Sequence, residues 1–284
     1  MEGLALMRTN LSWAQWFLVF GLIDFLNAEP IFGKNVAKVE KNEFLPVVSI
    51  YGRTDGMIGA KHHICGGTLI SSLHVLTAAH CILSEKIMES NFVLVGSNKL
   101  KSPEIRMFKP VTWLRYQDWG GRRVDFDAGY DDIAVIKLNE NVEGLKTADI
   151  EFGKKEIHAG TKFVLTGWGH TSGAKKAPIE PLILRKVSLE VTSKIECTKR
   201  VKILRACMKV DLINRDSSIC LTAKPHALGG PGDSGSPLFD MNHHLVGMHS
   251  WVCPKIKTDP EMKVNVALNL HFYKDFIEYA TNHL

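Results

Sequence analysis

Near its C-terminal end the chain reads Gly232-Asp233-Ser234-Gly235, which sets a serine between glycines. Two earlier segments complete its chemistry: Thr77-Ala78-Ala79-His80-Cys81 supplies a histidine, and Asp131-Asp132-Ile133-Ala134 supplies a carboxylate beside aliphatic residues. A serine becomes a nucleophile when a base takes its proton and a carboxylate holds that base. The three segments therefore predict nucleophilic catalysis, and their order along the chain separates this arrangement from other folds that use the same groups.

The rest of the chain predicts an all-β protein. Short segments rich in β-branched or aliphatic residues are separated by turn formers, and this spacing favours barrels or sandwiches over alternating strands and helices. Only residues 271–283 predict a helix, because Phe272, Phe276, Ile277 and Ala280 recur there at helical spacing. The predicted strands are 46–51, 68–73, 92–95, 133–138, 162–166, 187–191, 237–239, 244–249 and 263–269.

Taken in order, these motifs resemble those of the chymotrypsin-type (trypsin-like, family S1) serine endopeptidases. The resemblance covers nearly everything after the first 30 residues. It implies two packed antiparallel six-stranded β-barrels with a short C-terminal helix, the barrels spanning about 31–145 and 146–270. His80 and Asp132 are then expected on the first barrel and Ser234 on the second, with the active site between them. The matching segments are Ile31-Phe32-Gly33-Lys34, Cys65-Gly66-Gly67-Thr68-Leu69-Ile70, 77–81, 132–138, Gly167-Trp168-Gly169, 232–238 and 246–251.

The resemblance assigns the catalytic roles. Ser234 attacks the scissile carbonyl, His80 takes and returns the proton, and Asp132 holds the histidine, since the family pattern places this aspartate immediately before an apolar residue. The backbone N–H groups of Gly232 and Ser234 are expected to form the oxyanion hole. Ser236 stands where the family most often has glycine, but it follows the glycine nearest the nucleophile, so we expect it to be tolerated.

The expected specificity pocket departs from that of trypsin. Leu228 stands where trypsin-like members carry an aspartate that pairs with substrate Arg or Lys. A charged side chain at P1, the substrate residue before the scissile bond, would be buried there without a partner. Ser250 and Trp251 match the strand that binds the substrate backbone, and Val252 and Asn265 replace glycines common in the family. The pocket is therefore predicted to be shallow and to take small or medium apolar P1 residues.

Residues 1–28 are predicted to be a secretory signal peptide. Arg8 gives a positive start, residues 13–26 are mostly apolar, and Ala28 is a small residue at the expected cleavage point. Asp24 interrupts the apolar run, and a retained membrane anchor is the alternative interpretation. Residues 29–30 would form a short propeptide and 31–284 the protease domain. We therefore expect a secreted, extracellular protein with no membrane association in its mature form.

The start of the expected mature chain bears on activation. In the family a new N-terminal ammonium is buried against the aspartate before the nucleophile, and Ile31 and Asp233 are the matching pair. No basic residue lies between Arg8 and Lys34, so an activating enzyme of trypsin specificity has no site directly before Ile31. Signal cleavage after Ala28 would leave a dipeptide ending in proline, which an X-Pro dipeptidyl peptidase removes. The hypothesis is a zymogen activated by trimming; the alternatives are an inert extended terminus or leader cleavage elsewhere.

The chain has six cysteines, in agreement with an oxidising compartment. The resemblance implies the disulfides Cys65–Cys81 and Cys197–Cys220. Gly230 takes the place of the cysteine usually found just upstream of the nucleophile, so Cys253 lacks its usual partner. A compensating Cys207–Cys253 bridge is expected, and two free thiols are the alternative.

No cofactor or metal is expected. Adjacent histidines on a strand point to opposite faces, so the pairs His62-His63 and His243-His244 are interpreted as surface or loop residues. Segment 96–104 has one glutamate and two lysines, and so lacks the paired acids of a calcium loop. The net charge of +5 comes from dispersed residues, which favours solubility over binding of polyanions, and nucleic acid is not indicated.

Two classes of function remain from the sequence. The first is a secreted endopeptidase that cleaves protein or peptide substrates, with protein protease inhibitors as further partners. The second is a non-catalytic secreted homologue that acts as a binding or regulatory protein. Basic residues in 115–123, together with Trp113 and Trp119, could serve recognition in that second class.

Overall fold

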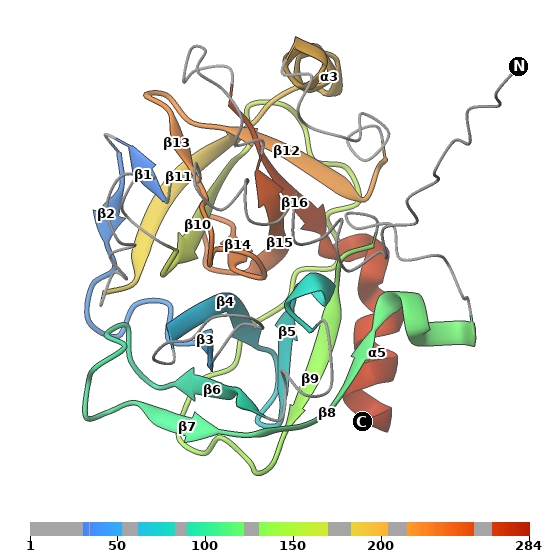
Figure 1. Cartoon of the computed structure of the whole chain (residues 1–284). Coiled ribbons are helices and arrows are strands. Elements are labelled where there is room, and N and C mark those ends of the chain that lie inside the picture. The colour runs from blue at the N-terminus through green and yellow to red at the C-terminus, as the bar shows by residue number, and fades with distance from the viewer. Residues whose placement is uncertain are drawn as a thin grey trace, which may run out of the picture.

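The computed structural model describes residues 31–33, 35–52, 62–82, 90–121, 131–169, 183–203, 215–252 and 263–284. Two β-structures lie one above the other, the first built from the earlier half of the chain and the second from the later half (Figure 1). The all-β fold class predicted from the sequence is confirmed. No helix within these ranges is long and apolar enough to cross a membrane.

The second structure is a closed barrel of six antiparallel strands. The hydrogen-bonded order is β10-β14-β15-β16-β12-β11, and a pairing of β10 with β11 closes the ring. Strand β11 alternates buried and less buried residues, so Val187, Leu189 and Val191 face the core as the period of a strand requires. The six strands are β10 (Lys162–Gly167), β11 (Arg185–Val191), β12 (Ser218–Thr222), β14 (Pro237–Phe239), β15 (Leu245–Val252) and β16 (Asn265–Asn269).

The first structure is a curled sheet in the order β7-β6-β3-β4-β5-β9-β8. Its two edge strands, β7 and β8, are separated in the chain by Lys109 alone. One bent segment therefore pairs with β6 on one side and with β9 on the other, and Pro110, which has no N–H to donate, stands at the bend. The strands are β3 (Val47–Gly52), β4 (His62–Leu69), β5 (His74–Thr77), β6 (Phe92–Val95), β7 (Arg106–Phe108), β8 (Pro110–Arg115) and β9 (Ala134–Leu138).

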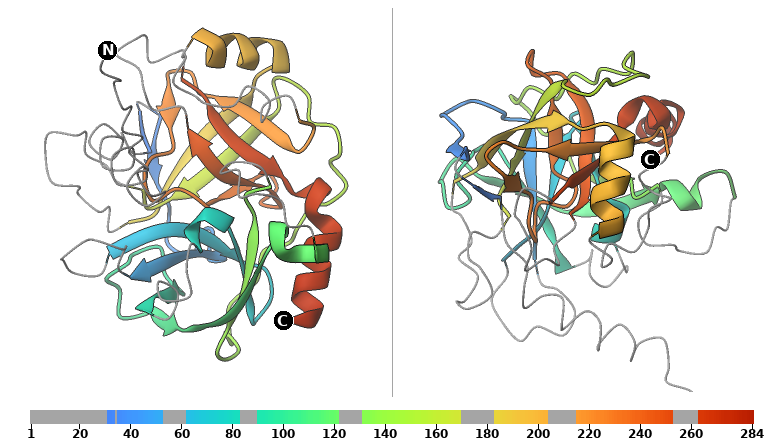
Figure 2. Two further views of the ribbon diagram at one scale, coloured as in Figure 1. Left: turned by 45° about the vertical axis from the view of Figure 1, so that its right-hand side comes forward. Right: turned by 90° about the horizontal axis from the view of Figure 1, so that it is seen from above.

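Each end of the described chain joins the structure built from the other half. Strand β1 (Phe32–Gly33) pairs with β13 (Ala227–Leu228), and β2 (Ala37–Lys38) pairs with β11 of the closed barrel. At the C-terminus, the 3-10 turn η5 (Leu270–Tyr273) leads into helix α5 (Lys274–His283), which lies beside the curled sheet in Figure 1 and in the left view of Figure 2. Phe276, Ile277 and Ala280 are buried there in the core of the first structure.

The remaining elements are short helices. The 3-10 turn η2 (Ala79–Cys81) follows β5, and the 3-10 turn η3 (Tyr116–Gly121) follows β8. Helix α3 (Lys194–Ile203) lies on the outer end of the closed barrel (Figure 1).

Most strand predictions match, and two of them, 92–95 and 237–239, coincide with β6 and β14. The prediction of a strand at 68–73 is wrong, because β4 ends at Leu69 and a turn precedes β5. The Ser71 hydroxyl accepts hydrogen bonds from the backbone N–H groups of Leu73 and His74, which stabilises that turn. Among the strands that the sequence pattern missed are β7, β8 and β12.

The expectation that the only helix lies at the C-terminus is also wrong, since α3 spans ten residues. Its sequence is mostly polar and carries no continuous apolar stripe, the signal by which an amphipathic helix is recognised. Cys197 and Val201 are buried, and a disulfide from Cys197 to Cys220 attaches the helix to strand β12. A covalent link replaces much of the apolar packing that normally holds a surface helix.

Candidate active site

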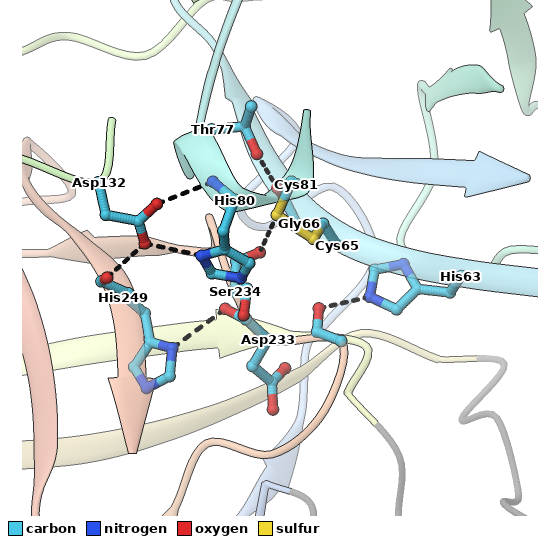
Figure 3. Close-up of a disulfide and its surroundings, with 12 residues drawn as sticks. His63, Cys65, Gly66, Thr77, His80, Cys81, Asp132, Asp233, Ser234 and His249 are labelled. Atoms are coloured by element: carbon cyan, nitrogen blue, oxygen red, sulfur yellow. Dashed lines mark hydrogen bonds and ion pairs between the residues drawn. A yellow bond between two sulfur atoms is a disulfide. The ribbon is translucent and has the colours of Figure 1, made fainter. Parts of the chain in front are cut away.

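The imidazole of His80 is held by the carboxylate of Asp132. The His80 Nδ1–H donates to Asp132 Oδ2 at 2.7 Å, and the His80 backbone N–H donates to Oδ1 at 2.8 Å. Both carboxylate oxygens are used, so the ring is fixed in orientation and its Nε2 is not engaged by Asp132. The side chain of His80 is 36 % exposed and that of Asp132 is 4 % exposed, so solvent reaches the base but not the carboxylate that orients it. Figure 3 shows the pair.

The electrostatics of this pair suit a base that gains a proton during a reaction. Burial alone lowers the pKa of His80, but the negative charge of Asp132 and the hydrogen bond to it raise that pKa above its ordinary value. Burial alone raises the pKa of Asp132, but the charge of His80 and hydrogen bonds from His80 and Ser250 bring it below its ordinary value. Asp132 is thus ionised at neutral pH and stabilises the charged imidazole.

Ser250 takes part in this network as well as lying on the expected substrate strand. Its hydroxyl donates to Asp132 Oδ2 at 2.6 Å, across a separation of 118 residues. The sequence resemblance had suggested only a backbone role for Ser250. Nothing local in the sequence signals the contact, because it exists only where β15 of the closed barrel meets the curled sheet.

Ser234 lies beside the His80 ring, on a loop that bonds to both structures (Figure 3). The carbonyl of Ser234 accepts from the Gly66 N–H at 2.8 Å, and the Gly235 N–H donates to the His249 carbonyl at 2.8 Å. Gly235 has φ of +77°, and a Cβ there would lie 2.4 Å from both the Gly66 carbonyl and the Thr77 hydroxyl. Only glycine fits that position, because its backbone adopts a left-handed conformation and atoms of the curled sheet occupy the space of a Cβ.

Asp233, next to the nucleophile, is completely buried. Its carboxylate accepts from the backbone N–H groups of Gly169 and Gly230, both at 2.8 Å, and from that of Ile31. Burial raises the pKa of Asp233 to about 7, and these hydrogen bonds only partly oppose it. Ile31 follows Pro30 in the full chain, so here its nitrogen is an amide and brings no positive charge to the carboxylate.

The residues expected to line the specificity pocket come together around the loop before the nucleophile. Leu228 is 3 % exposed on β13 and pairs with Phe32. The Asn265 side chain is fully buried: its Oδ1 accepts from the Gly229 N–H at 2.7 Å, and its Nδ2 donates to the Ala227 carbonyl at 3.2 Å. Trp251 and Val252 are partly exposed at the end of β15, and Val252 pairs with Asn265. Asn265 therefore also braces the loop, a role that the sequence did not suggest.

The interpretation of His63 as a surface or loop residue is wrong. His63 is 1 % exposed, its Nδ1 bonds the Ser49 hydroxyl at 2.7 Å, and its Nε2 donates to the carbonyl of Gly232 at 2.8 Å. Because β4 lies in the wall of a curled sheet, one of two adjacent histidines must face inward. His63 thereby fixes the peptide group between Gly232 and Asp233. Gly232 itself has a φ of +94°.

Asp131, the neighbour of Asp132, points away from His80. Its Oδ1 accepts from the hydroxyl of Tyr273 at 2.9 Å, and its Oδ2 lies 3.4 Å from Nη1 of Arg215. The residue has φ of +49°, so the backbone turns between the two aspartates. The two acids thus bond to different partners, and Asp132 is the one that reaches the histidine.

The structure contains the disulfides Cys65–Cys81 and Cys197–Cys220. The first one joins β4 to the turn η2 that carries His80, and so braces the base. Cys207 and Cys253 lie outside the described residues.

Among the described residues, Cys65, His80 and Cys81 form a group close enough to hold a metal ion. Its two sulfur atoms are joined to each other in a disulfide, however, and so are not thiolates that could bind a metal.

The fold and this site define a class: proteins in which a curled sheet packs on a closed β-barrel and a serine, histidine and aspartate meet at the junction. The family model described as Trypsin matches residues 35–277, and this chain belongs to that family. The resemblance to the S1 serine proteases, hydrolases that cleave peptide bonds, is thereby confirmed.

Individual relatives are distant. The chain is 27 % identical over 203 residues to "Fibrinolytic enzyme, isozyme C" of Lumbricus rubellus, covering 68 % of this chain and 78 % of that protein. It is 30 % identical over 191 residues to "Trypsin theta" of Drosophila melanogaster, covering 66 % of each. It is also 28 % identical over 200 residues to "Protein masquerade" of the same fly, of which it spans 18 %.

Replacing the aspartate tests the electrostatics of the pair. In Asp132→Asn the negative charge is gone while burial remains, so we expect the pKa of His80 to fall below its ordinary value of about 6.5 instead of lying above it. An NMR titration of the His80 ring measures this directly, without any substrate. The neighbouring Asp131→Asn serves as control and should shift that pKa far less. Equal shifts in the two variants would contradict the assignment.

Proposed function

We propose that this protein is a secreted serine endopeptidase that hydrolyses peptide bonds through an acyl-enzyme, without a cofactor. The observation that carries the proposal is the His80–Asp132 pair at 2.7 Å beside Ser234. Membership of the Trypsin family and two disulfides, which persist in oxidising compartments, support it. Its partners would be protein or peptide substrates and protein protease inhibitors.

Each residue has a distinct role in the proposed mechanism. Ser234 Oγ attacks the scissile carbonyl while His80 Nε2 takes its proton, and Asp132 stabilises the resulting imidazolium. His80 then gives the proton to the departing amine, and a water molecule repeats the sequence to release the acyl group. The negative oxygen of each intermediate would be bound by the N–H groups of Gly232 and Ser234. The hydrogen bond from His63 to the Gly232 carbonyl supports this role, because it orients the peptide between these two donors.

A non-catalytic secreted homologue is the second candidate. The family fold alone does not establish catalysis, because function resides in the site and not in the scaffold. Trp119 and Tyr279 form a ring pair with centroids 6.0 Å apart, and Tyr279 is 43 % exposed, which would suit recognition of a partner. The intact hydrogen bonds of His80 and Asp132 favour the enzyme.

Covalent labelling separates the two candidates. We expect a fluorophosphonate probe to label the mature protein at Ser234, and Ser234→Ala to lose both labelling and peptidase activity. His80→Ala should lose nearly as much, since base and nucleophile act as a unit and their effects do not add. Ser71→Ala, which removes a hydroxyl from a distant turn, is the control and should label normally. Absence of labelling in protein with a verified Ile31 terminus would favour the binding protein.

The pocket residues support a preference for small or medium apolar P1 residues over charged ones. The side chain of Leu228 is buried where a cation would need a carboxylate, and Asn265 already bonds the loop backbone. We expect substrates with Arg or Lys at P1 to be cleaved at least about a hundredfold more slowly than those with Val, since an unpaired buried charge costs several kcal/mol. A peptide library read by mass spectrometry measures this. Dominant cleavage after Arg or Lys would overturn the proposal.

Activation is proposed to depend on a free Ile31 amine that pairs with Asp233, after removal of Glu29-Pro30 by an X-Pro dipeptidyl peptidase. While the Ile31 nitrogen is still an amide, the pKa of Asp233 is about 7 in the folded protein and about 4 in the unfolded chain. Protonation of Asp233 then stabilises the fold fully below about pH 4, and this stabilisation is lost as the pH rises through about 7. An ammonium at Ile31 would offset the buried charge.

We therefore expect protein that begins at Glu29 to be inactive and to lose thermal stability between pH 5 and 8, while Asp233→Asn in that same form loses much less. Protein that begins at Ile31 should be active. Terminal sequencing of the secreted, active protein, together with thermal unfolding at the two pH values, tests both points. Full activity with Glu29 still attached would refute the mechanism.

A further inference from the structure

His249 is a fully enclosed imidazole directly before the substrate strand, and the catalytic mechanism does not use it. It is 2 % exposed on β15, next to Ser250. Its backbone is fixed by two hydrogen bonds with the nucleophile loop: its N–H donates to the Ser236 carbonyl and its carbonyl accepts from Gly235, both at 2.8 Å. The ring is therefore held in a constant position relative to Ser234.

The hydrogen bond of its Nδ1 determines which ring nitrogen carries the proton. Nδ1 lies 3.2 Å from the carbonyl oxygen of Asp233, which can only accept, so Nδ1 must donate. Burial lowers the pKa of His249 to about 4, and the nearby charge of His80 lowers it further, while Asp233, Asn265 and Asp132 act in the opposite direction. At neutral pH the ring is uncharged, and Nε2 carries a lone pair.

That lone pair has no hydrogen-bond partner among the described residues. The Asn265 side chain lies beside the ring and raises the pKa of His249, while its own hydrogen bonds join the Gly229 N–H and the Ala227 carbonyl. A buried acceptor without a donor costs about 1–3 kcal/mol, so any group that supplies one gains that energy.

The orientation of Nε2 places it at the specificity pocket. A Cβ on Gly229 would lie 2.7 Å from both Nε2 and Cε1 of His249, so the imidazole edge lies against the loop that follows Leu228. Gly229 and Asn265 lie against it, and together with Leu228, which directly precedes Gly229, they are the residues expected to form the base of the proposed P1 pocket. Nε2 of His249 is thus an unpaired acceptor beside the loop expected to form the pocket base.

We propose that His249 determines specificity by accepting a hydrogen bond from the P1 side chain, so that the enzyme prefers threonine to valine and serine to alanine at P1. This inference rests on the proposed peptidase function and refines it. Threonine has the size and shape of valine and adds one O–H donor, which suits a shallow pocket with one unpaired acceptor. A P1 carboxylate would not be favoured, since a neutral imidazole offers it no donor at Nε2.

The test compares peptides that differ only at P1. Active protein is first verified by labelling of Ser234, and kcat/KM is then measured for Thr against Val and for Ser against Ala. For the wild type we expect kcat/KM to be about tenfold higher for Thr than for Val and for Ser than for Ala. This is the effect of one buried hydrogen bond to an acceptor that is otherwise unpaired. His249→Leu should bring both ratios to one or below, and His249→Gln, whose amide oxygen can accept, should restore part of the preference. The distant His244→Leu is the matched control and should keep the wild-type ratios.

Each ratio is taken within one preparation, so it does not depend on the fraction of folded enzyme. If His249→Leu fails to fold, the wild-type ratios and His249→Gln still decide. A labelled enzyme that cleaves after Val at least as fast as after Thr overturns the inference while leaving the peptidase function intact. Ratios unchanged in His249→Leu, or fastest cleavage after Asp or Glu, overturn it equally. A protein that cannot be labelled at Ser234 fails at the earlier step, because the peptidase function is then wrong.

Discussion

The close approach of the two β-structures at Gly66 and Gly235 is the constraint on which the site depends. There the backbone of one structure bonds the backbone of the other, with Gly66 N–H donating to the Ser234 carbonyl at 2.8 Å. His80 and Asp132 come from the curled sheet, and Ser234 comes from the loop of the closed barrel. A side chain at Gly235 would overlap Gly66 and Thr77 and separate base from nucleophile. Catalytic geometry is thus set by packing between structures, and each supplies only part of the machinery.

Beneath this contact lies a second, electrostatic constraint. Asp233 is buried and forms no ion pair with the described residues, while three backbone N–H groups bond it, and burial raises its pKa to about 7. Such a group favours whatever conformation brings it positive charge. His63, bonded to the neighbouring Gly232 carbonyl, and His249, bonded to the Asp233 carbonyl, hold the same loop from opposite structures. The loop that carries Ser234 is therefore bound on every side by polar contacts, which suits a nucleophile that must be positioned accurately.

The sequence predicted those features that lie in short motifs. Ser234, His80 and Asp132 are each embedded in a local pattern whose residue types reveal its chemistry, and β6 and β14 are bounded by clear turn formers. What it missed depends on residues far apart in the chain. The Ser250–Asp132 hydrogen bond joins residues 118 apart, and the inward direction of His63 depends on the curl of its sheet. Helix α3 was missed because a disulfide, and not an apolar face, attaches it.

The exchange of chain ends between the two structures has a consequence for biosynthesis. The curled sheet is made almost entirely from residues before Leu138, yet Tyr273, Phe276, Ile277 and Ala280 belong to its core. That core cannot be completed until helix α5 has left the ribosome. A nascent chain would therefore expose apolar surface on its first half throughout synthesis of the second, a state prone to aggregation. Folding of the first half is therefore expected to wait for synthesis of α5 and to depend on protection of that surface until α5 arrives.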